Sequence, residues 1–264
     1  MKKIFRNIKL YSSFLIASLK EMLIYRVDCL VGILSQSLTQ IVGIIFIYIV
    51  FQNTNDLAGW NFEQILLLYG ITLMSVGVSS LGFDAAYDLG PKYIKEGEFD
   101  KILLRPVHPL ISIMGNSKDF VSFGYLILGL VLSIIMLVRL EITITVLLII
   151  KILFFAIIGG IIMGGIKAIF SITSFWTYRS NEIIWTFERL YTFAQYPIDI
   201  YSGFIKILIT YILPYAFVAY YPTLNYLGFS KYMMYISPII AILIWIIAII
   251  LWNFALKKYR STGN

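Results

Sequence analysis

Long apolar segments separated by short polar ones dominate the chain. A helix needs about 20 apolar residues to cross roughly 30 Å of hydrocarbon. Such segments occur at Leu30–Phe51, Ile65–Phe83, Phe120–Val138, Ile144–Phe170, Ile200–Ala219 and Met234–Leu256. Six crossings place both termini on one side of the membrane. The pattern predicts an all-α integral membrane protein with six transmembrane helices in a single transmembrane domain, residues 1–264.

The first 25 residues follow a different pattern. Apolar residues recur there every three or four positions, and lysine and arginine occupy the remaining faces. This pattern is typical of an amphipathic helix that lies in the membrane interface, held by apolar burial and by anionic lipid. We expect such a helix over residues 3–25, with membrane lipid as a partner. A solvated helical tail is the alternative.

Composition and charge narrow the class of protein further. Hydrophobic residues make up 60% of the chain and charged residues 13%, whereas soluble domains carry about 25% charged residues. Sixteen of the 21 basic residues precede the first span, follow the last, or lie in the two loops after the second and fourth spans. The positive-inside rule places these segments and both termini in the cytoplasm. The net charge of +7 therefore records orientation, and we expect no nucleic acid as a partner.

The fifth crossing has two interpretations. By hydropathy, residues 179–195 form a cytoplasmic connector and residues 200–219 cross the membrane. Alternatively, residues 178–196 cross despite their charges, and residues 197–222 form a re-entrant external hairpin whose helices are broken by prolines. In the second interpretation the charged residues of the crossing segment would line a polar interior and a possible translocation path; these are Glu182, Glu188 and Arg189. The family resemblance described below favours the second interpretation.

Residues that carry chemistry are scarce. A single histidine and a single cysteine exclude an HExxH zinc helix and CxxC metal sites, so we expect no metal, no cofactor and no enzyme activity on this chain. Gly160 and Gly164 form a GxxxG pattern inside an apolar span, which lets a neighbouring helix approach closely. Lys151 and Lys167 flank this pattern, and we expect each to extend toward the nearer membrane surface.

The cytoplasmic loop over residues 84–112 is the most informative polar segment. Acidic residues precede a short run of helical length, and Pro106 and Pro109 end it. Leu103, Leu104 and Val107 would give this short helix an exposed apolar face. An apolar face with flanking charges favours a docking surface for another protein. A loop folded back on the membrane is the alternative.

Two motifs resemble those of a known family, the type-2 ABC exporter permeases. The loop is similar to the cytoplasmic signature of that family at Gly97-x-x-Asp100-x-x-Leu103-Leu104-Arg105-Pro106-x-x-Pro109-Leu110. The second match is Tyr196-Pro197-x-x-x-Tyr201, followed by Pro214 and by Tyr220-Tyr221-Pro222. The resemblance covers nearly the whole chain in order, from the interfacial helix to the basic tail.

The resemblance implies a permease subunit of an ATP-driven exporter in a bacterial cytoplasmic membrane. Such a subunit forms half of a translocation path with a second permease, identical or different. Separate ABC ATPase subunits bind ATP and Mg²⁺. The loop would act as a coupling helix seated in the ATPase, through Glu98, Asp100, Leu103, Leu104, Arg105 and Pro106. The rival is an ATP-independent secondary transporter or channel subunit, which predicts inverted repeats that the sequence does not display.

Overall fold

The computed structural model describes residue 24 and residues 26–117, 119–177, 180–230 and 232–259. The interfacial helix expected over residues 3–25 lies outside these residues, apart from Ile24. Regular structure in the described residues is helical, with one isolated β-bridge between Leu57 and Trp60.

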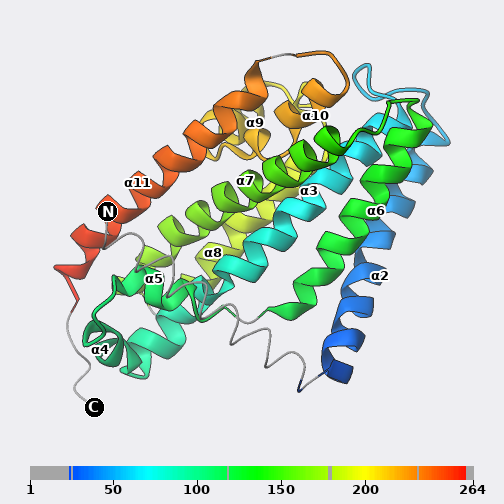
Figure 1. Ribbon diagram of the computed structural model, residues 1–264. Coiled ribbons are helices and arrows are strands. Elements are labelled where there is room, and N and C mark those ends of the chain that lie inside the picture. Colours follow the sequence, from blue (N-terminus) through cyan, green and yellow to red (C-terminus); the bar gives the residue numbers. More distant parts are fainter. Residues whose placement is uncertain (1–23, 25, 118, 178–179, 231, 260–264) are drawn as a thin grey trace.

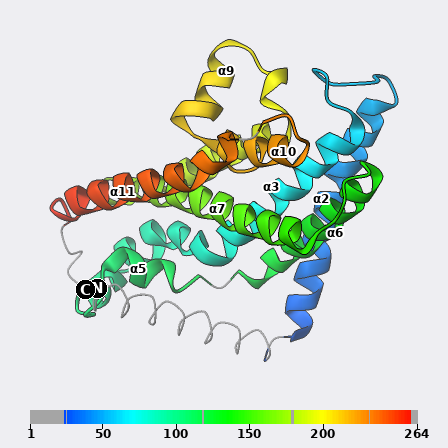
Figure 2. The ribbon, with the colours of Figure 1, turned by 45° about the horizontal axis from the view of Figure 1, so that its top comes forward.

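Five long helices lie side by side in a row (Figures 1 and 2). In the order of the row, α2 packs on α6, α6 on α3, α3 on α7, and α7 on α11. Each of the five is long and apolar enough to cross a membrane. Their bounds are Arg26–Phe51 for α2, Phe62–Phe83 for α3, Phe123–Arg139 for α6, Val146–Ser171 for α7 and Ser237–Leu256 for α11.

The helix α3 continues toward the loop over residues 84–112 without a sharp break. A 3-10 segment, η1 (Asp84–Asp88), and a π-helical segment, η2 (Leu89–Lys95), extend α3 into one helical run of 34 residues. Gly97, whose positive φ of 75° suits glycine, then turns the chain into the short helix α4 (Glu98–Leu103). The helix α5 (Pro109–Met114) follows, and η3 (Phe120–Ser122) leads into α6. We call this end of the molecule the α4 end.

After α7, the chain turns back along the row. The 3-10 segment η4 (Ile172–Phe175) ends α7, and α8 (Ser180–Arg189) continues into η5 (Leu190–Gln195). Ser174 donates a hydrogen bond to Ser180 at the α4 end (2.7 Å). Further along, Thr72 in the middle of α3 donates to the carbonyl of Ala194 (3.4 Å). The 10 residues of α8 and the 6 of η5 rise about 27 Å, close to the thickness of a hydrocarbon core.

The next segment is compact and bent, at the opposite end of the molecule, which we call the α10 end (Figure 1). Helical residues 203–212 and 215–226 meet at an angle of 65°, with Pro214 in the break. A bent pair of this kind is either one broken span or a re-entrant loop, so it fits both interpretations of the fifth crossing. Pro222 does not break a helix, however, because it lies in the first turn of α10, where a missing N–H costs no helical hydrogen bond. The segments are η6 (Ile198–Ile200), α9 (Gly203–Ile207), η7 (Leu208–Ile212), η8 (Tyr215–Phe217), α10 (Tyr220–Tyr226) and η9 (Met233–Ile236).

Close approach of helices holds the centre of the row together. A Cβ on Gly160 would lie 2.5 Å from Cβ of Val78 in α3, and one on Gly164 would overlap the ring of Phe83. On the other side of α3, a Cβ on Gly129 of α6 would lie 2.6 Å from the carbonyl oxygen of Gly70. Small residues therefore bring both neighbours against α3, as in close membrane-helix packing.

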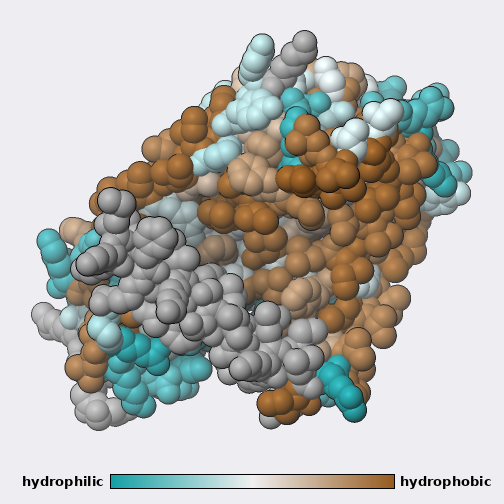
Figure 3. Space-filling model, in the orientation of Figure 1, coloured by the Kyte–Doolittle hydropathy of each residue, from teal (hydrophilic) through white to brown (hydrophobic). Residues whose placement is uncertain are grey.

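Large apolar side chains cover the outer faces of the row. In the view of Figure 3, an apolar band separates polar residues gathered at the two ends of the molecule. Exposed leucine, isoleucine, valine and phenylalanine residues of α2, α6, α7 and α11 make up much of this surface. Exposure of such a surface to water is unfavourable, whereas exposure to the hydrocarbon of a bilayer is not.

Candidate functional site

The short helix α4 is fixed to the bundle by one face. Phe99 and Ile102 are fully buried, at 0% and 2% exposure. The ring of Phe99 packs against Phe175 beyond α7, Trp252 of α11 and Tyr259, with centroids 5.6, 6.3 and 4.8 Å away. Aromatic contacts at such distances add stability beyond simple burial. These contacts join α4 to the ends of α7 and α11.

The opposite side of α4 is exposed. Leu104 is 86% exposed and Leu103 is 41% exposed, and Arg105 and Pro106 are exposed beside them. We call these four residues the α4 tip. Arg105 also donates a hydrogen bond from Nη1 to Oγ of Ser112 in α5 (2.9 Å), which holds the tip in one shape. An exposed leucine pair beside a cation, on a helix anchored from behind, is a surface suited to a protein partner.

The structure places the other residues of the loop differently from the sequence-based expectation. The acidic residues do not precede the helix, because Glu98 and Asp100 lie in its first turn, where the helix dipole favours them. Pro106 does not end the helix either, since α4 ends at Leu103 and Leu104 caps it. Asp100 accepts a hydrogen bond from the hydroxyl of Tyr259 (3.0 Å) and thus ties α4 to the segment after α11. The half-buried Glu98 lies beside it.

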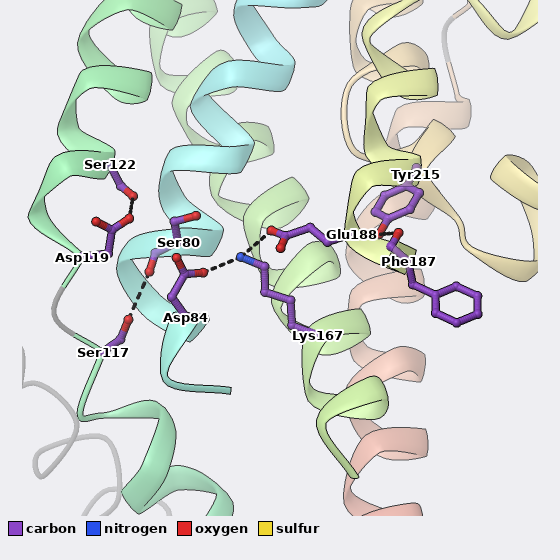
Figure 4. Close-up of polar contacts among 9 residues, drawn as sticks. All are labelled: Ser80, Asp84, Ser117, Asp119, Ser122, Lys167, Phe187, Glu188 and Tyr215. Atoms are coloured by element: carbon purple, nitrogen blue, oxygen red, sulfur yellow. Dashed lines mark hydrogen bonds and ion pairs between the residues drawn. The ribbon is translucent and has the colours of Figure 1, made fainter. Parts of the chain in front are cut away.

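A buried ionic network lies where α3, α7 and α8 converge, near the α4 end (Figure 4). The ammonium group of Lys167 in α7 lies 2.5 Å from Oδ1 of Asp84, at the start of η1, and 2.7 Å from Oε1 of Glu188 in α8. Only 2% of the Lys167 side chain is exposed, against 26% of Asp84 and 16% of Glu188. We call these three residues the ion triad.

The expectation that Lys167 extends to the membrane surface is therefore wrong. Two carboxylates from neighbouring elements satisfy its ammonium group inside the bundle, and the ring of Tyr87 lies 5.6 Å from it. Removing one partner of a buried ion pair costs about 3–5 kcal/mol, because the other charge stays buried without compensation. Lys151, at the opposite end of α7, remains half-exposed.

The three charged residues assigned together to a translocation path separate in the structure. Glu188 faces inward to Lys167, whereas Glu182 and Arg189 are exposed on other faces of α8. The guanidinium group of Arg189 lies 5.7 Å from the ring of Trp185, another exposed residue of α8. Sequence reasoning missed Asp84 and misread Lys167. The signal that was available is that an ionisable residue inside an apolar span usually has a partner there.

A polar pocket adjoins the triad at the α4 end. It has a volume of about 510 Å³, and its lining residues are Asp84, Ala85, Asp88, Lys92, Asn116, Ser117 and Asp119. Ser117 donates a hydrogen bond to the carbonyl of Ser80 (3.0 Å), and Ser122 donates one to Asp119 (Figure 4). Among the described residues, no group of three or more His, Cys, Asp or Glu side chains is placed to hold a metal ion.

His108 lies between the two prolines of the loop and contacts α11. Its Nε2 is 3.4 Å from Oδ1 of Asn253 in α11. Burial lowers the pKa of the His108 imidazole below its ordinary value, and the hydrogen bond to Asn253 opposes that shift. The residue thus forms a contact between the loop and α11.

Five apolar helices, an apolar outer surface and a polar loop anchored at one end define a multi-pass α-helical membrane protein. Comparison with known families gives the particular one. The family described as ABC-2 family transporter protein matches residues 37–263, so the chain belongs to this family. The predicted fold class and the predicted type-2 ABC permease family are thereby confirmed. Searches of curated proteins and of solved structures gave no match.

Membership in the family defines the role in outline. The chain is a membrane component of an ABC transporter, a transport subunit rather than a catalytic one, and the family implies association with ABC ATPase partners. The matched segment includes the loop over residues 84–112, the ion triad and the bent segment at the α10 end.

Proposed function

We propose that this chain is the permease subunit of an ATP-driven exporter and that the α4 tip docks on a separate ABC ATPase. The observation that carries this proposal is the two-sided character of α4. Phe99 and Ile102 fix one side in the bundle, while Leu103, Leu104 and Arg105 are presented outward on the other. In this arrangement the α4 end faces the cytoplasm of a bacterial cell, as the distribution of basic residues predicts.

The contacts behind α4 supply a mechanical route for coupling. The helical run from α3 to η2 leads into α4, and the rings around Phe99 join α4 to α7 and α11. Closure of an ATPase dimer would displace α4, and the attached helices would move with it as levers. A docking contact shifts the equilibrium between two permease states only when it differs in strength between them. ATP and Mg²⁺ bind to the ATPase in this scheme, and this chain holds no cofactor.

A second permease, identical or different, completes the translocation path in this proposal. The export direction rests on the likeness of the α4 loop to exporter permeases. The α8–η5 segment, with Glu188 facing inward, is the part of this chain that we assign to the path.

Leu104→Asp tests the docking proposal most cleanly. Leu104 is 86% exposed, so the variant should fold and insert normally. A carboxylate in an apolar docking contact should lower the amount of co-purified ATPase about tenfold or more, since it stays desolvated and unpaired there. Arg105→Glu is less clean, because Arg105 also binds Ser112. The measurement is the ratio of ATPase to permease after purification of the complex from membranes, and the ATP hydrolysis that this complex supports.

Lys95→Asp serves as the matched control, because it places the same carboxylate on an exposed position of η2. It should retain the ATPase to within about twofold, as surface substitutions usually do. Equal recovery of the ATPase with Leu104→Asp and with the unaltered chain would contradict docking through the α4 tip. A purified chain that conducts ions or moves solutes without any ATPase would instead support the channel or secondary-transporter alternative.

A further inference from the structure

We infer that the ion triad carries the movement of α4 to the α8–η5 segment, with Lys167 as the positioning residue between them. This inference rests on the proposed function, since it needs an ATPase to move α4. It goes further by assigning the connection inside the bundle to three side chains, Asp84, Lys167 and Glu188.

Each member of the triad belongs to a different moving part. Asp84 lies within the helical run that leads from α3 to α4, so a displacement of α4 along that run reaches its carboxylate. Glu188 lies in the last turn of α8. Lys167 in α7 lies 2.5 Å from the first carboxylate and 2.7 Å from the second. The ammonium group thus bridges the two helical segments (Figure 4).

The segments η1 and α8 also meet through two aromatic rings. The rings of Tyr87 in η1 and Trp185 in α8 lie 5.8 Å apart, but Trp185 is 53% exposed. An aromatic contact at a surface slides easily, whereas two ion pairs inside a protein have a few discrete arrangements. Elements with discrete arrangements are the ones that transmit a displacement between distant sites.

The ratio of one ammonium group to two carboxyl groups favours a network that can rearrange over one with a single arrangement. One ammonium group serves two carboxyl groups, and Asp88, Lys92 and Asp119 line the pocket beside Asp84. A shift of the α3 end can move Lys167 toward Glu188 or toward Asp84 without leaving the ammonium group unpaired. Each arrangement gives α8 a different position relative to α7.

The connection continues beyond α8 to the α10 end. The hydroxyl of Tyr215 in η8 donates a hydrogen bond to the carbonyl of Phe187, the neighbour of Glu188 (3.1 Å) (Figure 4). The rings of Phe187 and Phe170 stack with centroids 3.9 Å apart, which guides α8 along α7. A displacement of Glu188 is therefore passed to the bent segment over residues 203–226.

The test places a reporter at the far end of this route. Ser202 is exposed directly before α9. Ser202→Cys, in a chain whose single cysteine has been replaced by Cys29→Ser, is labelled by a membrane-impermeant maleimide in the purified complex. The labelling rate is compared without nucleotide and with ATP and vanadate. We expect the nucleotide to change the rate, and Lys167→Met to abolish that change. Because Lys167→Met leaves two carboxylates inside the bundle without their cation, the yield of folded complex should fall. Labelling and ATP hydrolysis are therefore measured per intact complex, and the hydrolysis should stay within about twofold.

Two further variants separate positioning from simple support of the fold. Lys151→Met makes the same chemical change at the other end of α7 and should leave the nucleotide response intact. Lys167→Arg keeps the charge and should restore most of the response. A purely structural role would instead lower ATP hydrolysis per complex and the labelling response in parallel, and Lys167→Arg would restore both together.

The outcomes distinguish this inference from the proposed function. A full nucleotide response in the Lys167→Met complex would overturn the inference alone, and so would a lack of response in a complex that holds its ATPase and hydrolyses ATP. Purification of the unaltered chain without any ATPase would overturn the proposed function, and the inference with it.

Discussion

The helices α2 and α3 are similar in composition and opposite in surroundings. In the most apolar stretch of each, 11% of the residues of α2 are buried, against 89% for the helical run that begins with α3. Hydropathy measures whether a helix can enter a bilayer, and it does not specify what the helix contacts there. The difference lies in the number of covered sides, since glycines of α6 and α7 meet α3 from two sides. In contrast, α2 meets Gly124 of α6 and presents leucine, isoleucine and valine outward on its other faces.

The largest effect should come from closing the gap between α3 and α7. In Gly160→Leu, the new side chain would meet Val78 and the backbone carbonyl of Ser75. Overpacking typically costs about 1–3 kcal/mol and occasionally more. Here the clash extends to the backbone of α3, so we expect a cost at the upper end and loss of the folded monomer from detergent extracts. Thermal unfolding followed by size-exclusion chromatography gives the measurement.

Ile157→Phe is the control for this substitution, because it adds volume to α7 at a position that is 47% exposed. It should unfold within a few degrees of the unaltered chain. If Gly160→Leu were equally stable, the close approach of α3 and α7 would not hold the row together.

A smaller effect is expected at the contact that joins α2 to α3. The hydroxyl of Tyr69 in α3 lies 3.2 Å from the carbonyl oxygen and 3.1 Å from the side-chain oxygen of Gln40 in α2. Tyr69→Phe removes this hydrogen bond and keeps the ring, so it should lower the free energy of unfolding by about 1 kcal/mol. It should also speed proteolysis in the loop between α2 and α3 relative to Tyr48→Phe, a change to an exposed tyrosine of α2. Equal rates for the two variants would show that α2 is held by other contacts.

The sequence predicts the crossing helices well because each needs only a long apolar run. Ile65–Phe83 and Phe120–Val138 lie within a few residues of α3 and α6 as observed. Hydropathy alone does not place a charged segment that packs against other helices. The α8–η5 segment carries Glu182, Glu188 and Arg189, which hydropathy assigns to water, yet contacts with α3 and α7 hold it along the row.

The same holds for the site: features that depend on the local sequence are predictable, and features that depend on distant contacts are not. The exposed leucines of the α4 tip follow from the sequence, since they sit between charges and prolines. Burial of Phe99 does not, because it depends on Trp252 and Tyr259, which are more than 150 residues away in the chain. Lys167 was misread for the same reason. Its partners Asp84 and Glu188 lie far away in sequence, and only the packing of three helices brings them within reach.

The smallest effect is expected on the outer face of α2. A shallow groove there is lined by Val31, Leu34, Ser35, Leu38, Thr39 and Val42. Leu34 and Val42 are 63% and 65% exposed. Replacing either by alanine should change the free energy of unfolding of the isolated chain by less than about 0.5 kcal/mol, as for exposed positions in general. Leu67→Ala, at a position of α3 with 0% exposure, should cost about 2–5 kcal/mol by comparison.

This last contrast separates lipid from protein as the neighbour of α2. If lipid alone covers the face, Leu34→Ala and Val42→Ala should leave the assembled transporter unchanged as well. If the second permease covers it, both variants should dissociate the assembly at lower detergent concentration while the isolated chain stays stable. Cross-linking yield between permease subunits, measured beside the unfolding of the isolated chain, decides between the two. A large loss of stability in the isolated chain would contradict both alternatives. It would require this face of α2 to be packed inside the chain, whereas only 11% of the most apolar stretch of α2 is buried.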